Sequence, residues 1–122
     1  MIKTNLKITN FEATPDVREY LDKKLAKIGD IAKQHQEEVI LRVEIGKNTE
    51  HHQQGEVFRT EIQTHVNGKD HRAVSEREDI FSAIDDAQEM LLQELLQNKK
   101  KNETLMKKGG RKLKEAIRKF YN

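Results

Sequence analysis

The sequence contains no cysteine and no tryptophan, only one proline, and no long hydrophobic run. Without cysteine the chain forms neither a disulfide nor a thiolate site, which fits a reducing compartment. No apolar run approaches the roughly 20 residues that cross a bilayer. The first ten residues alternate and lack the continuous apolar segment of a signal peptide. We therefore expect a cytoplasmic protein that is neither secreted nor membrane-spanning.

Charge is abundant but unevenly distributed. The 122 residues carry 23 Lys and Arg against 21 Asp and Glu, and 34% are apolar, which suits one domain with a modest core. Residues 1–98 hold 13 basic and 19 acidic side chains, whereas residues 99–122 hold 10 and 2. An acidic body with a basic terminal segment indicates a polyanionic partner. A disordered, solubilising tail is the alternative interpretation.

Hydrophobic periodicity predicts four strands and two helices. Alternating apolar residues indicate strands, and apolar residues three and four apart indicate amphipathic helices. The strands are expected at residues 2–10, 39–45, 58–66 and 69–76, and the helices at residues 14–29 and 79–101. Thr14 and Pro15 provide an N-cap and a first helical position. Gly29 can end the first helix, although Ile31 and Ala32 allow one more turn.

The dipeptide Asn67-Gly68 predicts a type I′ hairpin turn. If Val66 pairs with Lys69, Ile62 faces Ala73 on the inner side of the sheet. The outer pairs are then His65 with Asp70, Gln63 with Arg72, and Arg59 with Glu76. Complementary outer pairs and an apolar inner pair support this register.

The element order is β-α-β-β-β-α, and it predicts an α+β fold. The helical crossover makes the first two strands parallel, and the remaining strands form an antiparallel meander. Both helices must cover the same apolar face, because the other face is charged. We therefore expect a two-layer sandwich with a four-stranded sheet and two helices on one face.

No catalytic or metal-binding constellation is present. A glycine-rich phosphate loop, a nucleophile elbow and a zincin motif are all absent. His51 and His52 are adjacent, but no further ligands accompany them. Asp85 and Asp86 follow each other on a helix, with Asp86 expected to point outward into solvent. We predict no enzyme activity, no cofactor and no metal.

Basic residues form two candidate binding segments. On the first helix, four cations lie off the apolar stripe, where they can contact RNA phosphates: Arg18, Lys23, Lys24 and Lys27. Pairing within the helix, from Glu19 to Lys23, is the alternative interpretation.

The tail has five cations around apolar residues at helical spacing: Arg111, Lys112, Lys114, Arg118 and Lys119. Such a helix suits RNA, an anionic membrane surface or a partner groove, and at this length it is expected to order on its target.

The stretch Glu76–Asp85, the element order and the hairpin at Val66-Asn67-Gly68 together resemble the ribosome hibernation-promoting factor / protein Y family in its short form. The resemblance covers residues 1 to about 100. It implies a fold similar to double-stranded RNA-binding domains and a monomeric translation inhibitor without enzyme activity. The partner would be small-subunit rRNA in the decoding channel, rather than DNA or a membrane, with ribosomes held idle under stress.

The resemblance also implies RNA-binding residues. The four cations of the first helix correspond to the family's basic first helix, and Lys69, His71 and Arg72 lie on the strand after the turn. The second helix is acidic and apolar until Lys99, Lys100 and Lys101, which we include among the RNA-binding residues. Arg77 stands where the family commonly has glycine.

The basic tail is expected to compensate for the missing cations of the second helix. We expect a ribosome-binding domain at residues 1–101 and a basic tail at residues 102–122, either disordered or a short amphipathic helix. If the tail engages about six phosphates, deleting residues 102–122 lowers the slope of log affinity against log salt by roughly 4 to 5 units. Two alternatives stay open: a general RNA-binding module, and a protein-interaction regulator using the Met90–Leu96 stripe and the tail.

Overall fold

The computed structural model describes residues 2–48 and 56–108, with side chains as far as Gln97. Its elements are β1 (Ile2–Thr9), α1 (Pro15–Ala32), β2 (Val39–Asn48), β3 (Val57–Val66), β4 (Lys69–Arg77) and α2 (Ile80–Lys108). The predicted order and the α+β class are therefore confirmed.

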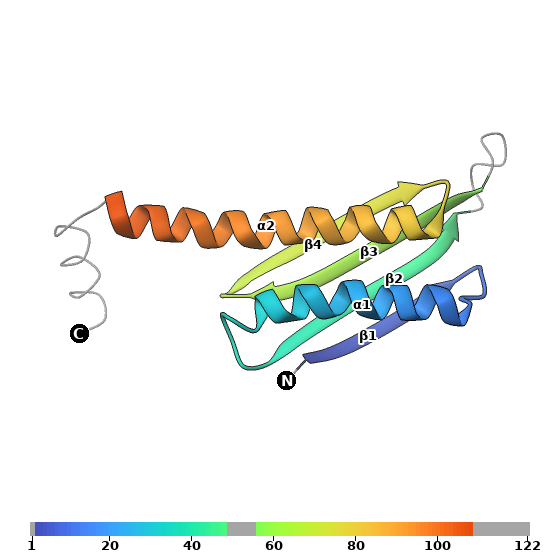
Figure 1. The fold of residues 1–122 in the computed structure, drawn as a ribbon, viewed down its shortest axis with the longest axis horizontal. Coiled ribbons are helices and arrows are strands. Elements are labelled where there is room, and N and C mark those ends of the chain that lie inside the picture. The colour runs from blue at the N-terminus through green and yellow to red at the C-terminus, as the bar shows by residue number, and fades with distance from the viewer. Residues whose placement is uncertain (1, 49–55, 109–122) are drawn as a thin grey trace.

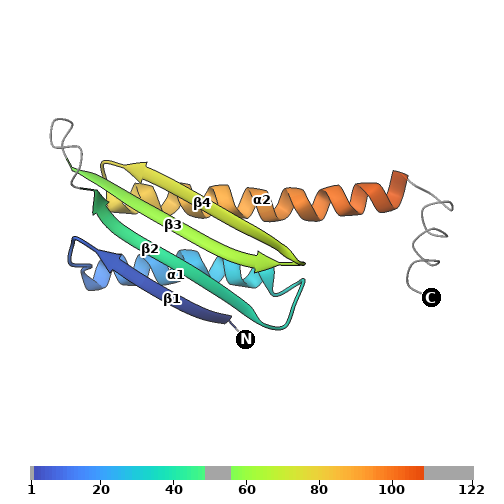
Figure 2. The same cartoon turned by 180° about the vertical axis from the view of Figure 1, so that it is seen from behind.

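The four strands form one mixed sheet in the order β1-β2-β3-β4. β1 and β2 are parallel, and the other neighbouring pairs are antiparallel. Both helices lie on the same face, α1 over β1 and β2, and α2 over β3 and β4 (Figure 1). Seen from behind, the sheet lies in front of the helices and its other face is uncovered (Figure 2). The predicted two-layer sandwich is confirmed.

The hairpin between β3 and β4 has the predicted register. Val66 pairs with Lys69, and Ile62 pairs with Ala73. The outer pairs are also as predicted: His65 with Asp70, Gln63 with Arg72, and Arg59 with Glu76. Asn67 and Gly68 have φ angles of 54° and 74°, the left-handed conformation that a type I′ turn requires.

Helix α1 begins at the predicted cap but passes through Gly29. The Thr14 hydroxyl accepts a hydrogen bond from the Val17 amide at 3.4 Å. Gly29 is buried against β1, where a Cβ would lie 2.5 Å from Cδ1 of Ile2. This glycine therefore leaves room for the Ile2 side chain of β1, and the helix continues to Ala32.

The core lies between the sheet and the two helices. Its largest fully buried apolar side chains come from α1, the central strands and α2: Leu21, Ile28, Val39, Leu41, Ile45, Ile62, Ile84 and Leu91. Burying each such side chain contributes about 1.5–3 kcal/mol to folding. The apolar side of α2 thus packs against β3, β4 and α1.

Helix α2 extends beyond the end of the sheet in both views (Figures 1 and 2). At its start, the Asp79 carboxylate accepts a hydrogen bond from the Ser82 amide at 3.1 Å. The helix ends at Lys108, seven residues past the expected domain boundary at residue 101. His51, His52 and the predicted terminal amphipathic helix lie outside the described residues.

Candidate nucleic-acid interface

Three of the four predicted cations on α1 are available at the surface. Arg18, Lys23 and Lys27 are exposed, and within residues 2–48 and 56–108 none of them forms an ion pair. The alternative interpretation, pairing of Lys23 with Glu19, is therefore not seen. Acidic residues such as Asp22 are also exposed on α1. Binding of a polyanion to this surface would therefore depend on where its cations lie rather than on its net charge.

The fourth cation, Lys24, is part-buried at the edge of the interface between the helices. Its Nζ lies 3.1 Å from Asp85 Oδ1 and 5.2 Å from the centre of the Tyr20 ring. Tyr20 also donates its hydroxyl hydrogen bond to Asp85 and packs edge-on against Phe81, with ring centres 5.1 Å apart. Lys24 thus joins α1 to α2.

The same contacts shift the pKa values of Asp85, Lys24 and Tyr20. Burial acts to raise the pKa of Asp85, but hydrogen bonds from Tyr20 and Lys24 outweigh it, so the pKa is lowered. The hydrogen bond to Asp85 raises the pKa of Lys24. The hydrogen bond to the same carboxylate raises the pKa of Tyr20. Asp85 is therefore ionised and Lys24 charged at neutral pH.

Asp86 does not point into solvent as expected. Its Oδ2 accepts hydrogen bonds from the Ser75 hydroxyl at 2.7 Å and from Arg77 at 2.8 Å. The expectation was wrong because β4 lies beside α2 and supplies donors that the helix sequence alone does not reveal. Asp86 thus ties the start of α2 to the end of β4.

The three predicted residues on β4 have different surroundings. Lys69 is exposed beside the turn. The His71 side chain is fully buried under α2, with Nδ1 3.0 Å from Glu94 Oε1 and a buried Nε2 without a hydrogen-bond partner. Arg72 lies on the open face and contacts Glu61 at 2.7 Å. His71 therefore cannot contact RNA at the surface, which corrects the expectation for this residue.

Gln36 fixes the end of the molecule where Lys69 lies. Its side-chain amide donates to the His65 carbonyl at 3.0 Å, and its carbonyl accepts from the Asn67 amide at 3.3 Å. These bonds join the loop after α1 to the β3–β4 turn. Lys69 is thereby presented on a constrained turn, an arrangement that the sequence did not indicate.

The remaining predicted cations lie at the C-terminal end of the chain. Lys99, Lys100 and Lys101 belong to α2, in the direction in which this helix passes the sheet (Figure 1). The five tail cations lie outside the described residues: Arg111, Lys112, Lys114, Arg118 and Lys119.

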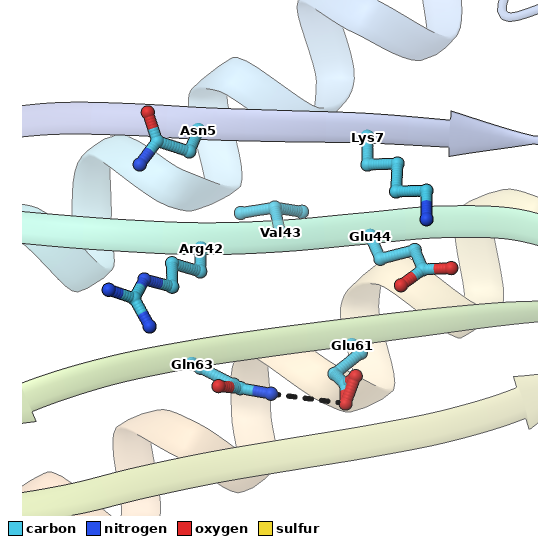
Figure 3. Close-up of a pocket in the computed structure, with 7 residues that line it drawn as sticks. All are labelled: Asn5, Lys7, Arg42, Val43, Glu44, Glu61 and Gln63. Atoms are coloured by element: carbon cyan, nitrogen blue, oxygen red, sulfur yellow. Dashed lines mark hydrogen bonds between the residues drawn. The ribbon is translucent and has the colours of Figure 1, made fainter.

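The open face of the sheet contains a polar hollow that the sequence did not single out (Figure 3). It has a volume of about 260 Å³ and is lined by Asn5, Lys7, Arg42, Val43, Glu44, Glu61 and Gln63. Burial acts to raise the pKa of Glu61, but hydrogen bonds from Arg72 and Gln63 and the nearby Arg59 charge lower it overall. Knowing the strand order was necessary to find this hollow, because its residues come from three strands.

Other kinds of site find little support in the described part of the chain. Residues 2–48 and 56–108 contain no group of three His, Cys, Asp or Glu side chains that could hold a metal. No described helix is long and apolar enough to cross a membrane. Of the apolar stripe proposed for a protein partner, Met90 and Leu96 are exposed, whereas Leu91, Leu92 and Leu95 are buried.

Comparison with solved structures supports the same fold. The Thermus thermophilus protein Y N-terminal domain is 26% identical, with a TM-score of 0.59 over 76% of this chain and 94% of that domain. A ribosomal subunit interface protein from Coxiella burnetii is 17% identical, with a TM-score of 0.56 over 81% and 98% of the two chains, and this second likeness concerns the fold alone.

Comparison with known sequences identifies the family. No curated protein matched the chain. Residues 4–103 match the family described as sigma 54 modulation protein / S30EA ribosomal protein. This match confirms the resemblance predicted from Glu76–Asp85 and the element order. The chain therefore belongs to the sigma 54 modulation protein / S30EA ribosomal protein family.

Proposed function

We propose that this protein binds small-subunit rRNA in the decoding channel and keeps idle ribosomes from translating. Its family indicates association with the ribosome and a role in translation regulation. One similar structure is the N-terminal domain of protein Y from Thermus thermophilus. The observation that carries the finer proposal is the set of exposed, unpaired cations on α1: Arg18, Lys23 and Lys27.

The proposed contact surface has two described parts. The first is the outer side of α1, where Lys23 and Lys27 are one helical turn apart and can approach neighbouring phosphates. The second is the end of the molecule at Lys69 and the C-terminal turns of α2. Lys24 and Arg72 are assigned structural roles instead, because Asp85 and Glu61 neutralise them.

Binding of this kind inhibits translation without catalysing a reaction. Each lysine or arginine that meets a phosphate releases condensed counterions, so affinity falls steeply as salt rises. Backbone contacts position the protein on folded RNA without reading a sequence. A rigid domain held in the decoding channel then excludes messenger and transfer RNA by occupying their space.

Charge removal on α1 tests this proposal. The variant Arg18→Gln, Lys23→Gln, Lys27→Gln is compared with a control that loses three strand cations, Lys3→Gln, Lys47→Gln, Arg59→Gln. Co-sedimentation with vacant small subunits is measured across a salt series. We expect the α1 variant to bind at least about tenfold more weakly and its log–log salt slope to fall by roughly 2 to 3 units.

The control is expected to bind within about threefold of wild type, because its three residues lie off the proposed contact surface and Lys47 and Arg59 are already paired with Glu56 and Glu61. Loss of these exposed ion pairs should also cost little stability. Equal losses in the two variants would show that net charge alone drives binding. No loss in the α1 variant would refute the assignment of this surface.

A further inference from the structure

Two glutamates lie directly opposite each other on the open face. Glu44 on β2 pairs in register with Glu61 on β3, and like charges in this position destabilise a sheet. Glu61 is compensated by Arg72 at 2.7 Å and Arg59 at 3.6 Å. Glu44 accepts one hydrogen bond, from the Thr9 hydroxyl at 3.3 Å, and Lys7 lies opposite it in register on β1 but forms no ion pair with it among the described residues. One carboxylate is thus satisfied, and its neighbour has acceptors to spare.

Arg42 has the opposite need, because its hydrogen-bond donors have no acceptor among the described residues. It lies two residues before Glu44 on the same face, about 6.6 Å away along the strand. It is exposed, and within residues 2–48 and 56–108 its guanidinium has no ion-pair or hydrogen-bond partner. Figure 3 shows the Arg42 and Glu44 side chains pointing apart along β2. Both residues line the hollow of about 260 Å³.

A ligand that satisfies both groups must offer two donors to Glu44 and two acceptors to Arg42. Guanine has this pattern, with N1–H and N2–H₂ on one edge and O6 and N7 on the next. Adenine lacks the paired donors, so Glu44 would stay unpaired. An arginine from a partner protein would suit Glu44, but Arg42 and Lys7 would repel it.

We infer that the hollow between Arg42 and Glu44 binds the base of an unpaired guanosine. Lys7, which also lines the hollow, is placed to meet the attached phosphate. No aromatic side chain of the described residues lines the hollow, so the base has no stacking partner among them, and a weak, specific contact is expected. The ligand is either a free guanosine nucleotide or an unpaired guanine in rRNA, and the second case rests on the proposed function.

Nucleotide titrations of the intact protein test the base specificity. Amide shifts of ¹⁵N-labelled protein are followed with 5′-GMP, and separately with 5′-AMP, 5′-CMP and 5′-UMP. We expect GMP to shift the amides around Arg42 and Glu44 and to bind at least about tenfold more tightly than the other three, as one bidentate pair allows. Equal binding of all four nucleotides would overturn the inference.

Matched variants test the residues. Glu44→Gln is expected to weaken GMP binding about tenfold, because it removes the charged acceptor pair. Glu76→Gln has the same charge change on the same face and should bind GMP as wild type does. Unchanged GMP binding in Glu44→Gln would also overturn the inference.

Footprinting separates the two sources of guanine. Kethoxal, which adds to N1 and N2 of unpaired guanines, is applied to small subunits carrying wild type, Glu44→Gln or Glu76→Gln. Protection of a guanine by wild type and Glu76→Gln, lost in a still-bound Glu44→Gln, identifies rRNA as the source. GMP specificity without such protection identifies the free nucleotide. Failure of every form to sediment with subunits contradicts the proposed function, and the GMP titration then still decides the guanine site.

Discussion

Lys24 and Asp85 lie 3.1 Å apart across the interface between α1 and α2. This ion pair neutralises one of the four predicted α1 cations, the part-buried Lys24, whereas Arg18, Lys23 and Lys27 stay exposed and unpaired among the described residues. Internal pairing with acids similarly engages Arg72, Arg77 and Lys47. The arrangement of the acidic residues therefore decides which cations are unpaired at the surface.

The variant Asp85→Asn is expected to lower the free energy of unfolding by about 1 kcal/mol at pH 7, because hydrogen bonds to a charged acceptor are lost at a half-exposed site. The pKa of Asp85 is lowered in the folded protein from the ordinary value of 3.8. Its contribution is therefore complete above that value and disappears as the pH falls through the folded pKa. Urea unfolding at pH 7 and pH 3 measures the difference.

The difference between wild type and Asp85→Asn should shrink in the acidic sample. Asp22→Asn, an exposed change on α1, serves as the control and should alter stability by less than about 0.5 kcal/mol. A difference for Asp85→Asn that stays constant between the two pH values would contradict the role given to its ionised form.

His71→Leu is expected to leave both stability and ribosome binding nearly unchanged. Leucine keeps most of the packing and removes the buried Nε2 that has no partner, while Glu94 is exposed enough to be solvated. His71→Ala should cost about 2–3 kcal/mol through the cavity it leaves. Thermal unfolding and subunit pelleting measure the two properties. A stable His71→Leu that no longer binds subunits would show that His71 contacts RNA after all.

Two single changes on the open face should alter stability in opposite directions. Glu44→Gln removes the repulsion with Glu61 on β3 and the weaker attraction to Lys7 on β1, which forms no ion pair with Glu44 among the described residues. The net effect is expected to add about 0.2–1 kcal/mol to the free energy of unfolding. Glu76→Gln removes a negative charge that lies opposite Arg59 in register, and it is expected to cost a few tenths of a kcal/mol at most, because the ion pair of Arg59 is with Glu61. Denaturant titrations of both variants measure this. A loss of stability in Glu44→Gln would show that Glu44 is already well compensated.

Deletion of residues 109–122 tests the basic tail and leaves α2 intact. It removes five cations, so the log–log salt slope of subunit binding should fall by roughly 3 to 5 units if all of them meet phosphates. A tail of the same composition in shuffled order is the control. If the shuffled tail restores binding, charge suffices; if only the native order does, the amphipathic pattern is also needed. An unchanged slope after deletion would refute the tail's role.

Local signals predicted the fold well. The Asn67-Gly68 turn set the register of β3 and β4, and Thr14 with Pro15 set the start of α1, because each depends on residues that are neighbours in the chain. The same logic places His71 on the inner side, two residues before the inward-facing Ala73. That signal was in the sequence, although the resemblance to the family assigned His71 to RNA.

Contacts between distant segments were not predictable in the same way. In the sequence, β2, β3 and β4 lie between Lys24 and Asp85. No pattern within either helix shows that these two residues are in contact. The hollow at Arg42 and Glu44 likewise depends on the order of β1, β2 and β3. Such sites become visible only when the register across several strands is known.

Pelleting of the intact chain with vacant small subunits tests the proposed function most directly. The measurement is made in dilute buffer, then with added salt, and then with messenger and transfer RNA bound to the subunits. We expect saturable pelleting with vacant subunits, lost as salt rises and strongly reduced when the channel is filled. Failure to pellet with vacant subunits, or equal pelleting with filled ones, would contradict binding in the decoding channel.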